Sequence, residues 1–472
     1  MLQAGFGCID ITPEKATHLG GGLNTYRPAH LVGDPLFARA MIVNNQTTKI
    51  CFISLDLVTL TREYSDKIRN AVAETYCIPY DAVMVHTTQT HSAPGLGYFM
   101  LDNDFSVPDD SEWLRGGSRD YCDFAIPRII ESVKCANANM KPALIGIGSG
   151  IEGRMAHNRR AVMRDGSIGM PWKNWRIPWK GGQGTDIGPT GVCYIEGPID
   201  PEAGVLCITN PALRPVAVMV NYTCHPVHVY PKQIISADWP GAVVSKIKGM
   251  YGSDCFGMVL NGACGNINPW PPFDPDYVED HYHMGSVLGQ MAANIIETMA
   301  FQSDIQIDYR AKNIQIPLRT IAPIEHAWAK DILEKHPAPH WTNDKHTEVD
   351  LDWVYAASIM SVYLQKQREK ALDYEIQIFR VGNAVFVGLP GEPFVEGQLK
   401  IKLSSPVRNT YVVHNVNQYA GYIPTKEAFN YRLGTGGHEV DTRYWAKLVP
   451  EALDMIVNET IVMLKDIFKQ NS

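Results

Sequence analysis

The feature that most constrains the fold is a series of short apolar runs that each lead directly into a polar segment. The clearest is residues 83–97, where an apolar run continues through His86, Gln89 and His91 and stops at a Ser-Ala-Pro-Gly turn. A short apolar run that ends in turn residues predicts a buried strand. The polar side chains then lie where a strand ends and a loop begins, a common place for the binding and catalytic groups of α/β enzymes.

Strand and helix patterns alternate along the chain. Apolar strands at 38–43 and 49–58 are followed by a helical pattern at 61–76 and then by the strand that opens 83–97. The same reading predicts helices at 121–136, 279–300 and 444–468, strands at 143–150, 205–209, 215–222, 256–260 and 411–415, and hairpins at 158–168 and 374–387. This alternation predicts an α/β fold with a mixed β-sheet core flanked by helices.

The 472 residues could form two domains or one large α/β unit with insertions. No internal sequence repeat, low-complexity linker or clear domain boundary is evident. We therefore expect a single domain over residues 1–472. A helical elaboration is expected at about 321–373, interrupted near Pro337 and Pro339.

Composition narrows the class of protein. The formal net charge is −8, and lysines and arginines are scattered, so no nucleic-acid partner is indicated. No apolar stretch approaches the ~20 residues of a membrane-spanning helix. No signal peptide is visible, which predicts a soluble protein that is cytoplasmic, or secreted or periplasmic if a signal peptide has been removed. The ten cysteines form no CxxC pair and indicate reduced, mostly buried side chains.

Four apolar strands end in side chains that could bind a metal ion. Imidazole, carboxylate and phenol groups suit Zn²⁺, and a catalytic zinc site lowers the pKa of its water to about 7. For a single histidine, a structural role as a buried polar group is the alternative. The candidates are Gln89 with His91, His225, Glu392, and Tyr419 with Tyr422.

Five motifs, in this order, carry a resemblance to a known family. They are Thr-Gln-Thr-His-Ser-Ala-Pro-Gly, Thr-Cys-His-Pro, Asn-Gly-Ala-Cys-Gly-Asn-Ile-Asn-Pro, Leu-Pro-Gly-Glu-Pro and Asn-Gln-Tyr-Ala-Gly-Tyr-Ile-Pro-Thr. Together with the opening Gly-Phe-Gly-Cys-Ile-Asp-Ile-Thr-Pro, this set resembles the catalytic N-terminal domain of neutral/alkaline (non-lysosomal) ceramidases. The resemblance covers about residues 5–425. It implies a ceramidase-like catalytic domain without the family's C-terminal immunoglobulin-like domain, and hydrolysis of an amide with one Zn²⁺.

The resemblance also implies roles for individual residues. The metal ligands fall on Gln89, His225, Glu392 and Tyr422, where Gln89 replaces a family histidine. The second histidine of that motif falls on His91, the family's catalytic arginine resembles Arg159, and its serine falls on Asn268.

These two replacements leave the choice of ligand and reaction open. Gln89 could ligate the metal weakly, His91 or His86 could supply the nitrogen, another metal could bind, or the site could hold none. We expect a metal-dependent hydrolase of an amide or ester other than ceramide, in which Arg159, His91, and Tyr419 or Asn268 stabilise an oxyanion or donate a proton. The alternative is a catalytically altered relative that binds a small polar or sugar ligand.

Residues outside the motifs add expectations. Asp238 could orient a ligand histidine, or could cap the helix that follows it. His438 and Glu439 could reach the site as a lid. A broken loop at 169–188 could pack on itself or form a platform for a sugar-like substrate through its tryptophans, which are Trp172, Trp175 and Trp179.

Overall fold

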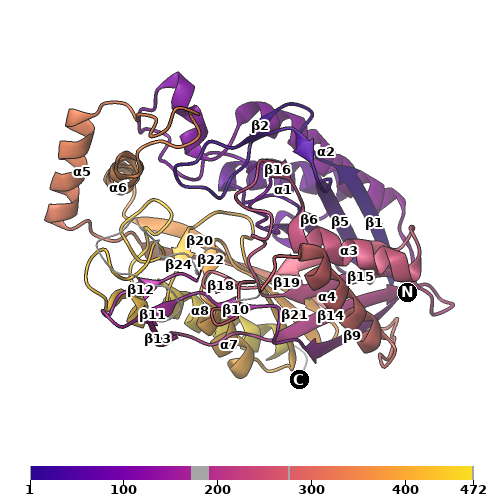
Figure 1. Ribbon diagram of the computed structural model, residues 1–472. Coiled ribbons are helices and arrows are strands. Elements are labelled where there is room, and N and C mark those ends of the chain that lie inside the picture. Colours follow the sequence, from indigo (N-terminus) through magenta and orange to yellow (C-terminus); the bar gives the residue numbers. More distant parts are fainter. Residues whose placement is uncertain (1, 172–190, 275–276, 470–472) are drawn as a thin grey trace.

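The computed structural model describes residues 2–171, 191–274 and 277–469. Its core consists of three large β-sheets with helices packed on them (Figure 1). The mixed α/β architecture expected from the sequence is confirmed. Among the described residues, no helix is long and apolar enough to span a bilayer.

The first sheet contains the strand that begins the segment 83–97. Its strands are β1 (Gln3–Asp10), β5 (Phe37–Asn44), β6 (Lys49–Leu55), β7 (Val83–Thr87) and β8 (Lys141–Pro142). The order is β7-β6-β5-β1-β8, and only β6 and β7 are parallel. Helix α1 (Arg62–Tyr76) joins β6 to β7, and α2 (Arg119–Ala138) packs on β1 and β5.

The second and third sheets repeat this plan. The second consists of β9 (Leu144–Ile151), β14 (Glu202–Thr209), β15 (Pro215–Tyr222) and β17 (Phe256–Asn261), with helices α3 (Asp238–Tyr251) and α4 (His281–Ile296). The third consists of β19 (Ile307–Pro317), β20 (Ala371–Val381), β21 (Ala384–Gly388) and β23 (Asn409–Val413), with helices α7 (Val395–Ser404) and α8 (Ala452–Lys469).

All three sheets share one topology. Three antiparallel strands are followed by a helix and then by a fourth strand, parallel to the third, and a second helix packs on the unit. In each unit the crossover helix (α1, α3 or α7) connects the two parallel strands. The fourth strands, β7, β17 and β23, meet one another at the centre of the molecule.

Hydrogen bonds between main-chain groups and the His86 imidazole link the three units at this centre. His86 Nδ1 donates to the His414 carbonyl over 2.7 Å, and His86 Nε2 accepts from the Asn261 N–H over 3.0 Å. The Asn261 carbonyl in turn accepts from the His414 N–H. Because both ring nitrogens of His86 are engaged, this residue serves the junction of the three units.

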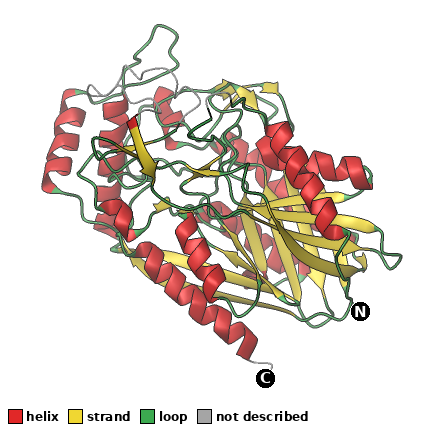
Figure 2. Ribbon diagram, turned by 60° about the horizontal axis from the view of Figure 1, so that its bottom comes forward, coloured by secondary structure: helices red, strands yellow, loops and turns green. Residues whose placement is uncertain are grey.

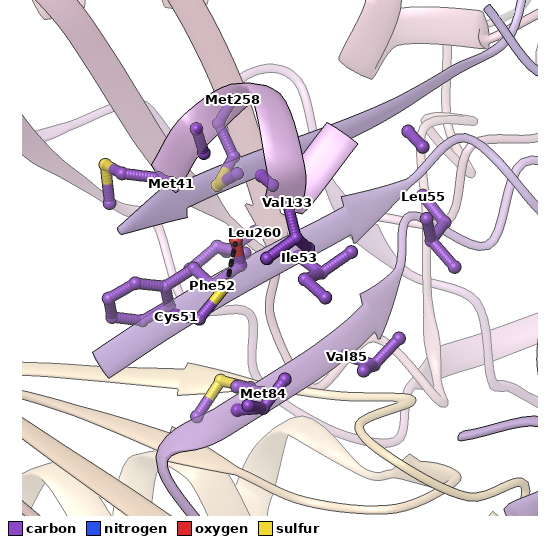
Figure 3. Close-up of a cluster of buried hydrophobic side chains, with 14 of the residues drawn as sticks. Met41, Cys51, Phe52, Ile53, Leu55, Met84, Val85, Val133, Met258 and Leu260 are labelled. Atoms are coloured by element: carbon purple, nitrogen blue, oxygen red, sulfur yellow. Dashed lines mark hydrogen bonds between the residues drawn. The ribbon is translucent and has the colours of Figure 1, made fainter. Parts of the chain in front are cut away.

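The largest apolar cluster spans the first sheet and reaches the other two. Met41, Phe52, Met84 and Met258 lie together in it, as Figure 3 shows. Strands such as β7 are buried along their whole length, which explains their near-continuous apolar sequence. Burial of a side chain such as that of Phe52 contributes about 1.5–3 kcal/mol.

Residues 321–373 contain a pair of helices at one edge of the molecule (Figures 1 and 2). These are α5 (Pro323–Lys335) and α6 (Leu351–Arg368), and the two prolines lie between them. A small cluster of Ala329, Ala356 and Ile359 holds the pair together.

Short strands make up the rest of the β-structure. Two pairs carry site residues: β10 (His157–Asn158) with β18 (Ile267–Asn268), and β22 (Glu392–Pro393) with β24 (Tyr422–Ile423). The others are β2 (Thr17–His18), β3 (Pro28–Ala29), β4 (Leu31–Val32), β11 (Ala161–Met163), β12 (Ile168–Gly169), β13 (Val192–Ile195) and β16 (Ile234–Ile235).

One expectation differs from the structure. The terminal helix begins at Ala452 and not at 444, because Trp445 and Ala446 are buried in a loop before it and Pro450 precedes its first turn. All ten cysteines are free and most of them are buried, as expected, while Cys8, Cys77 and Cys193 are exposed.

Candidate active site

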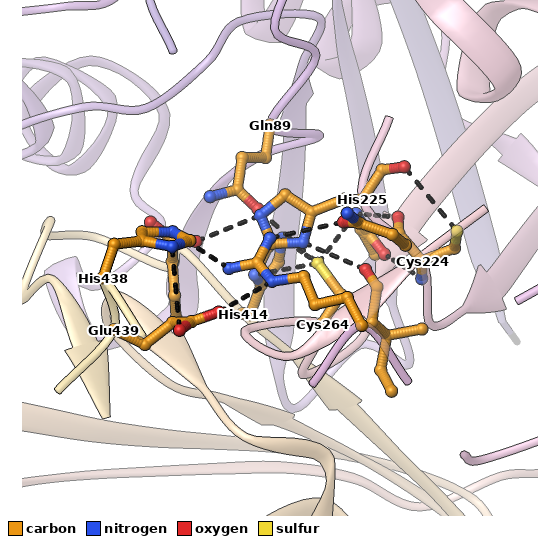
Figure 4. Close-up of polar contacts among 12 residues, drawn as sticks. Gln89, Cys224, His225, Cys264, His414, His438 and Glu439 are labelled. Atoms are coloured by element: carbon orange, nitrogen blue, oxygen red, sulfur yellow. Dashed lines mark hydrogen bonds and ion pairs between the residues drawn. The ribbon is translucent and has the colours of Figure 1, made fainter. Parts of the chain in front are cut away.

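The polar motifs of the sequence converge at the carboxyl ends of the parallel strand pairs. Gln89 follows β7, His225 follows β15, Glu392 follows β21 and Tyr419 follows β23. Since the parallel strands of all three units end around the same central junction, their loops meet there (Figure 4).

His225 is held in one orientation. It is fully buried, and its Nδ1 lies 3.1 Å from the Ile267 carbonyl oxygen. Its Nε2 lies 3.1 Å from Oε2 of Glu392. Burial and the nearby charge of Arg159 lower the pKa of His225, so the ring is neutral at pH 7. Both ring nitrogens face oxygen acceptors, so a neutral ring donates from one nitrogen and leaves the other free to bind a cation.

Glu392 is the buried carboxylate of the site. Its Oε1 accepts a hydrogen bond from the Tyr419 hydroxyl over 3.0 Å. Burial alone would raise its pKa, but the contacts with His225, the charge of Arg159 and a hydrogen bond from Gln89 outweigh burial and lower it to about 2. Glu392 is therefore ionised at neutral pH.

His225 and Glu392 face each other across the centre of the site. Without a metal ion, Nε2–H of His225 can donate to the carboxylate oxygen 3.1 Å away, whereas in the tautomer with its proton on Nδ1 the Nε2 nitrogen is an acceptor. Two acceptors this close are stabilised by a shared cation, and roughly 3.3 Å separates two donors on one tetrahedral zinc ion. The pair fits a divalent metal. Among the described residues, however, no group of three or more His, Cys, Asp or Glu side chains is arranged to hold one.

Gln89 lies beside this pair. Its backbone is in the left-handed region at φ 68°, which turns the chain sharply after β7. Its amide hydrogen-bonds Glu392, and its Oε1 accepts from the Cys264 thiol over 3.5 Å. The structure therefore brings Gln89 to the predicted place, with its oxygen turned towards Cys264.

The two histidines of the opening strand have different surroundings. His91 packs edge-on against His225, with ring centroids 5.5 Å apart, and burial lowers its pKa to about 3. His86 lies in the central junction with both nitrogens engaged by main-chain groups. His86 has no free nitrogen to offer a metal in this arrangement, whereas His91 lies at the site.

Arg159 brings a permanent positive charge to the site. Its guanidinium lies over the Tyr422 ring at 5.3 Å, and Nη1 donates to Oδ1 of Asn268 over 3.3 Å. Nε donates to Oε1 of Glu439 over 2.9 Å. Asn268 comes close because β10 and β18 pair directly beside it.

The two tyrosines are protonated. Burial and the charge of Glu392 raise the pKa of both Tyr419 and Tyr422 well above the usual value. Tyr422 pairs with Glu392 across β22 and β24, so both residues are carried by one short strand pair. Each phenol can therefore donate a hydrogen bond at neutral pH.

Asp238 holds a different histidine from the one at the site. Its carboxylate accepts from Nδ1 of His228 over 2.8 Å and from the Val229 N–H. Nδ1 of His225 faces the Ile267 carbonyl instead. Asp238 thus orients His228, and it forms the first residue of α3 instead of its N-cap.

Several residues at the site were weakly signalled or missed by sequence analysis. His438 lies 5.2 Å from Tyr422, ring to ring, and its Nε2 is 3.4 Å from Arg159 Nη2. Glu439 binds both Arg159 and Arg160. Their only sequence signal was a position after a Gly-rich loop. Cys264 lay inside a motif but was expected only to pack. Trp172, Trp175 and Trp179 lie outside the described residues.

Solved structures of other proteins contain the same arrangement of sheets. A neutral ceramidase from Pseudomonas aeruginosa superposes with a TM-score of 0.70 over 99% of this chain and 75% of its own, at 16% identity. The fold is that of the neutral ceramidases. A structure titled "Ceramidase complexed with C2" matches with a TM-score of 0.67 at the same identity and coverage.

The unmatched quarter of each ceramidase chain is compatible with the expected correspondence to the catalytic domain. No protein-family model and no curated protein sequence matches the chain. The likeness at 16% identity therefore speaks for the fold, and function is argued from the residues.

Proposed function

We propose that the protein is a hydrolase that cleaves an amide or ester bond with a divalent metal ion, zinc by its donor types, held by His225 and Glu392. The observation that carries this proposal is the 3.1 Å contact between a neutral imidazole nitrogen and an ionised carboxylate oxygen. Tyr422 and Gln89 would complete the ligand set, with the Gln89 amide rotated so that its oxygen leaves Cys264.

When bound, the metal would supply a Lewis acid and lower the pKa of a water molecule. With a metal bound, the Ile267 carbonyl would accept a hydrogen bond from Nδ1–H of His225, which leaves Nε2 free to bind. Tyr419 steadies the carboxylate by donating to Oε1 of Glu392. These contacts fix both donors before any ligand arrives.

Arg159 is suited to stabilise negative charge on a carbonyl oxygen. Its guanidinium is charged at every relevant pH, and it is 5% exposed, so its field is little screened. Glu439 and Asn268 hold it in place from two sides. His91 and His438 are both neutral at pH 7, because burial lowers their pKa values to about 3 and about 4, so each ring offers one hydrogen-bond donor and one acceptor to the reacting groups.

The substrate is proposed to be an amide or ester other than ceramide, and a carbohydrate-related one remains part of the proposal. The support is the chemistry of two positions, where Gln89 and Asn268 replace a histidine and a serine of the ceramidases that the motifs resemble. A site with two amide side chains offers donors and acceptors to a polar headgroup.

Metal content is the direct test. Protein purified without chelator is analysed by elemental mass spectrometry, together with His225→Ala, Glu392→Gln and the exposed histidine variant His340→Ala. Wild type and His340→Ala should carry about one zinc per chain, and the two site variants should lose it. Hydrolysis of a panel of acyl nitroanilides and nitrophenyl esters should follow metal content and stop in EDTA.

A second candidate function is binding of a small polar ligand without hydrolysis. It is favoured by Gln89, whose amide is already engaged by Glu392 and Cys264. Metal-free wild-type protein that is fully stable in EDTA and inactive on the whole panel would support this candidate and contradict the hydrolase.

A further inference from the structure

A cavity adjoins the candidate active site, and Tyr419 belongs to both. Its volume is about 750 Å³, and it lies between the start of α1, the start of α2, α6 and the segments around Gln418 and Lys447. Tyr419 lines it and also donates its hydroxyl to Glu392. Neither His225 nor Glu392 lines the cavity, so it is distinct from the proposed metal site.

Lys447 lines this cavity with a buried ammonium group. The residue is only 4% exposed, and its Nζ lies 3.9 Å from the centre of the Tyr444 ring. No carboxylate of the described residues lies within ion-pair distance of it, and no described acceptor hydrogen-bonds it. A buried ammonium without an acceptor is costly, so it is unusual unless a ligand supplies one.

The acidic side chains of the cavity wall are already engaged. Asp373 pairs with Arg62 at 2.8 Å, and Glu63 pairs with Lys67 at 2.7 Å. Glu112 accepts from the Tyr98 hydroxyl and Glu369 from the Gln365 amide. None of these contacts reaches Lys447. Its ammonium feels the charge of Glu369 but lies outside ion-pair distance of it, so a ligand can become its direct partner.

Two further features bear on the ligand, and the first of them favours an anion. The first turns of α1 and α2 both line the cavity, through Arg62 and Arg119, and the N-terminal end of a helix attracts negative charge. Gln418 also lines it, and its Oε1 is buried without a hydrogen-bond partner. That oxygen can accept from a hydroxyl group of a ligand.

We infer that this cavity binds a small organic anion, a carboxylate or a phosphate monoester, whose charged group contacts the Lys447 ammonium. The volume lies within the roughly 300–1,000 Å³ of metabolite-sized sites, so the ligand has room for an organic part beside its charged group. The site is independent of the proposed hydrolysis, although Tyr419 connects the two.

Binding of two probes, succinate and inorganic phosphate, tests this inference by isothermal titration calorimetry. At least one probe should bind wild type, and Lys447→Met should weaken its affinity about 10-fold or more. Lys465→Met removes an equal charge from the exposed face of α8 and should leave the affinity unchanged. The stronger probe identifies the carboxylate or the phosphate source.

Two outcomes would overturn the inference: neither probe binds, or Lys447→Met binds as wild type does. Loss of binding in His225→Ala would also overturn it, because the anion would then sit at the metal site. If Lys447→Met does not fold, acetic anhydride labelling of wild type replaces it. Mass spectrometry should then show the probe protecting Lys447 and not Lys465, and equal labelling with and without the probe would count against the site.

Discussion

At the scale of single residues, His225 and Glu392 are defined by their hydrogen-bond partners more than by their type. The Ile267 carbonyl faces Nδ1 of His225, and the Glu392 carboxylate faces its Nε2. Sequence motifs pointed to both residues, but their pairing depends on a contact between segments 167 positions apart. The chemistry of the pair therefore follows from geometry that the motifs do not contain.

The position of the His91 imidazole depends on a neighbouring glycine, Gly21. Gly21 has φ 86°, and a Cβ there would lie 2.3 Å from Nδ1 of His91. We expect Gly21→Ala to displace the imidazole and to lower kcat/KM on the best substrate of the panel by on the order of 10-fold to 100-fold. Gly166→Ala is the matched control, because Gly166 has φ 80° and a Cβ there meets nothing within 4 Å. Equal activity of the two variants would show that the position of His91 is not needed.

At the scale of elements, local pattern predicted most helices and hairpins. The helix expected at 61–76 is α1, and the hairpin at 374–387 is β20 and β21 turning at Gly382. The sequence predicts the start of the terminal helix too early. Trp445 is not part of that helix; it lies in a loop and is buried against α6, including Tyr355. Apolar residues in buried loops imitate periodicity, and only tertiary contacts distinguish them.

The end of α1 provides a test of local backbone cost. Cys77 caps this helix in the left-handed conformation, at φ 53°, and it is exposed. Cys77→Gly should raise the free energy of unfolding by about 1 kcal/mol, because glycine adopts this conformation without steric cost. Cys77→Ala keeps the Cβ and should give no such gain. Urea unfolding of the three proteins measures the difference, and an equal gain from alanine would point to loss of the thiol instead.

At the scale of the whole molecule, three units of one topology bring their parallel strands to a common centre. The sequence shows no repeat, because each unit fills the same topology with different side chains, such as His86, Asn261 and His414 around the junction. The motifs at the strand ends were predictable one by one. Their convergence was not, since it depends on how three sheets pack together.

The junction makes stability depend on pH. Burial lowers the pKa of His86 to about 3 from an ordinary value of 6.5, so between these values the unfolded chain binds a proton that the folded chain does not. The stability from His86 is therefore present above pH 6.5 and is lost as pH falls towards 3, by about 1.4 kcal/mol per pH unit. Urea unfolding between pH 4.5 and 6.5 should show a shallower slope for His86→Asn than for wild type. Exposed His340→Asn is the control, and an unchanged slope in His86→Asn would contradict the prediction.

The last connection across the molecule is a buried ion-pair cluster. Glu439, which is 2% exposed, pairs with Arg159 and Arg160, which lie 280 and 279 positions before it in the chain. Glu439→Gln leaves two buried guanidinium groups without their shared carboxylate, and should lower the free energy of unfolding by about 3–5 kcal/mol. Glu334→Gln, in the exposed pair with Lys330, should cost less than ~1 kcal/mol. Urea unfolding compares the two variants. Equal losses would mean that water reaches the cluster, and Arg159 would then lack the unscreened charge on which its proposed role in hydrolysis depends.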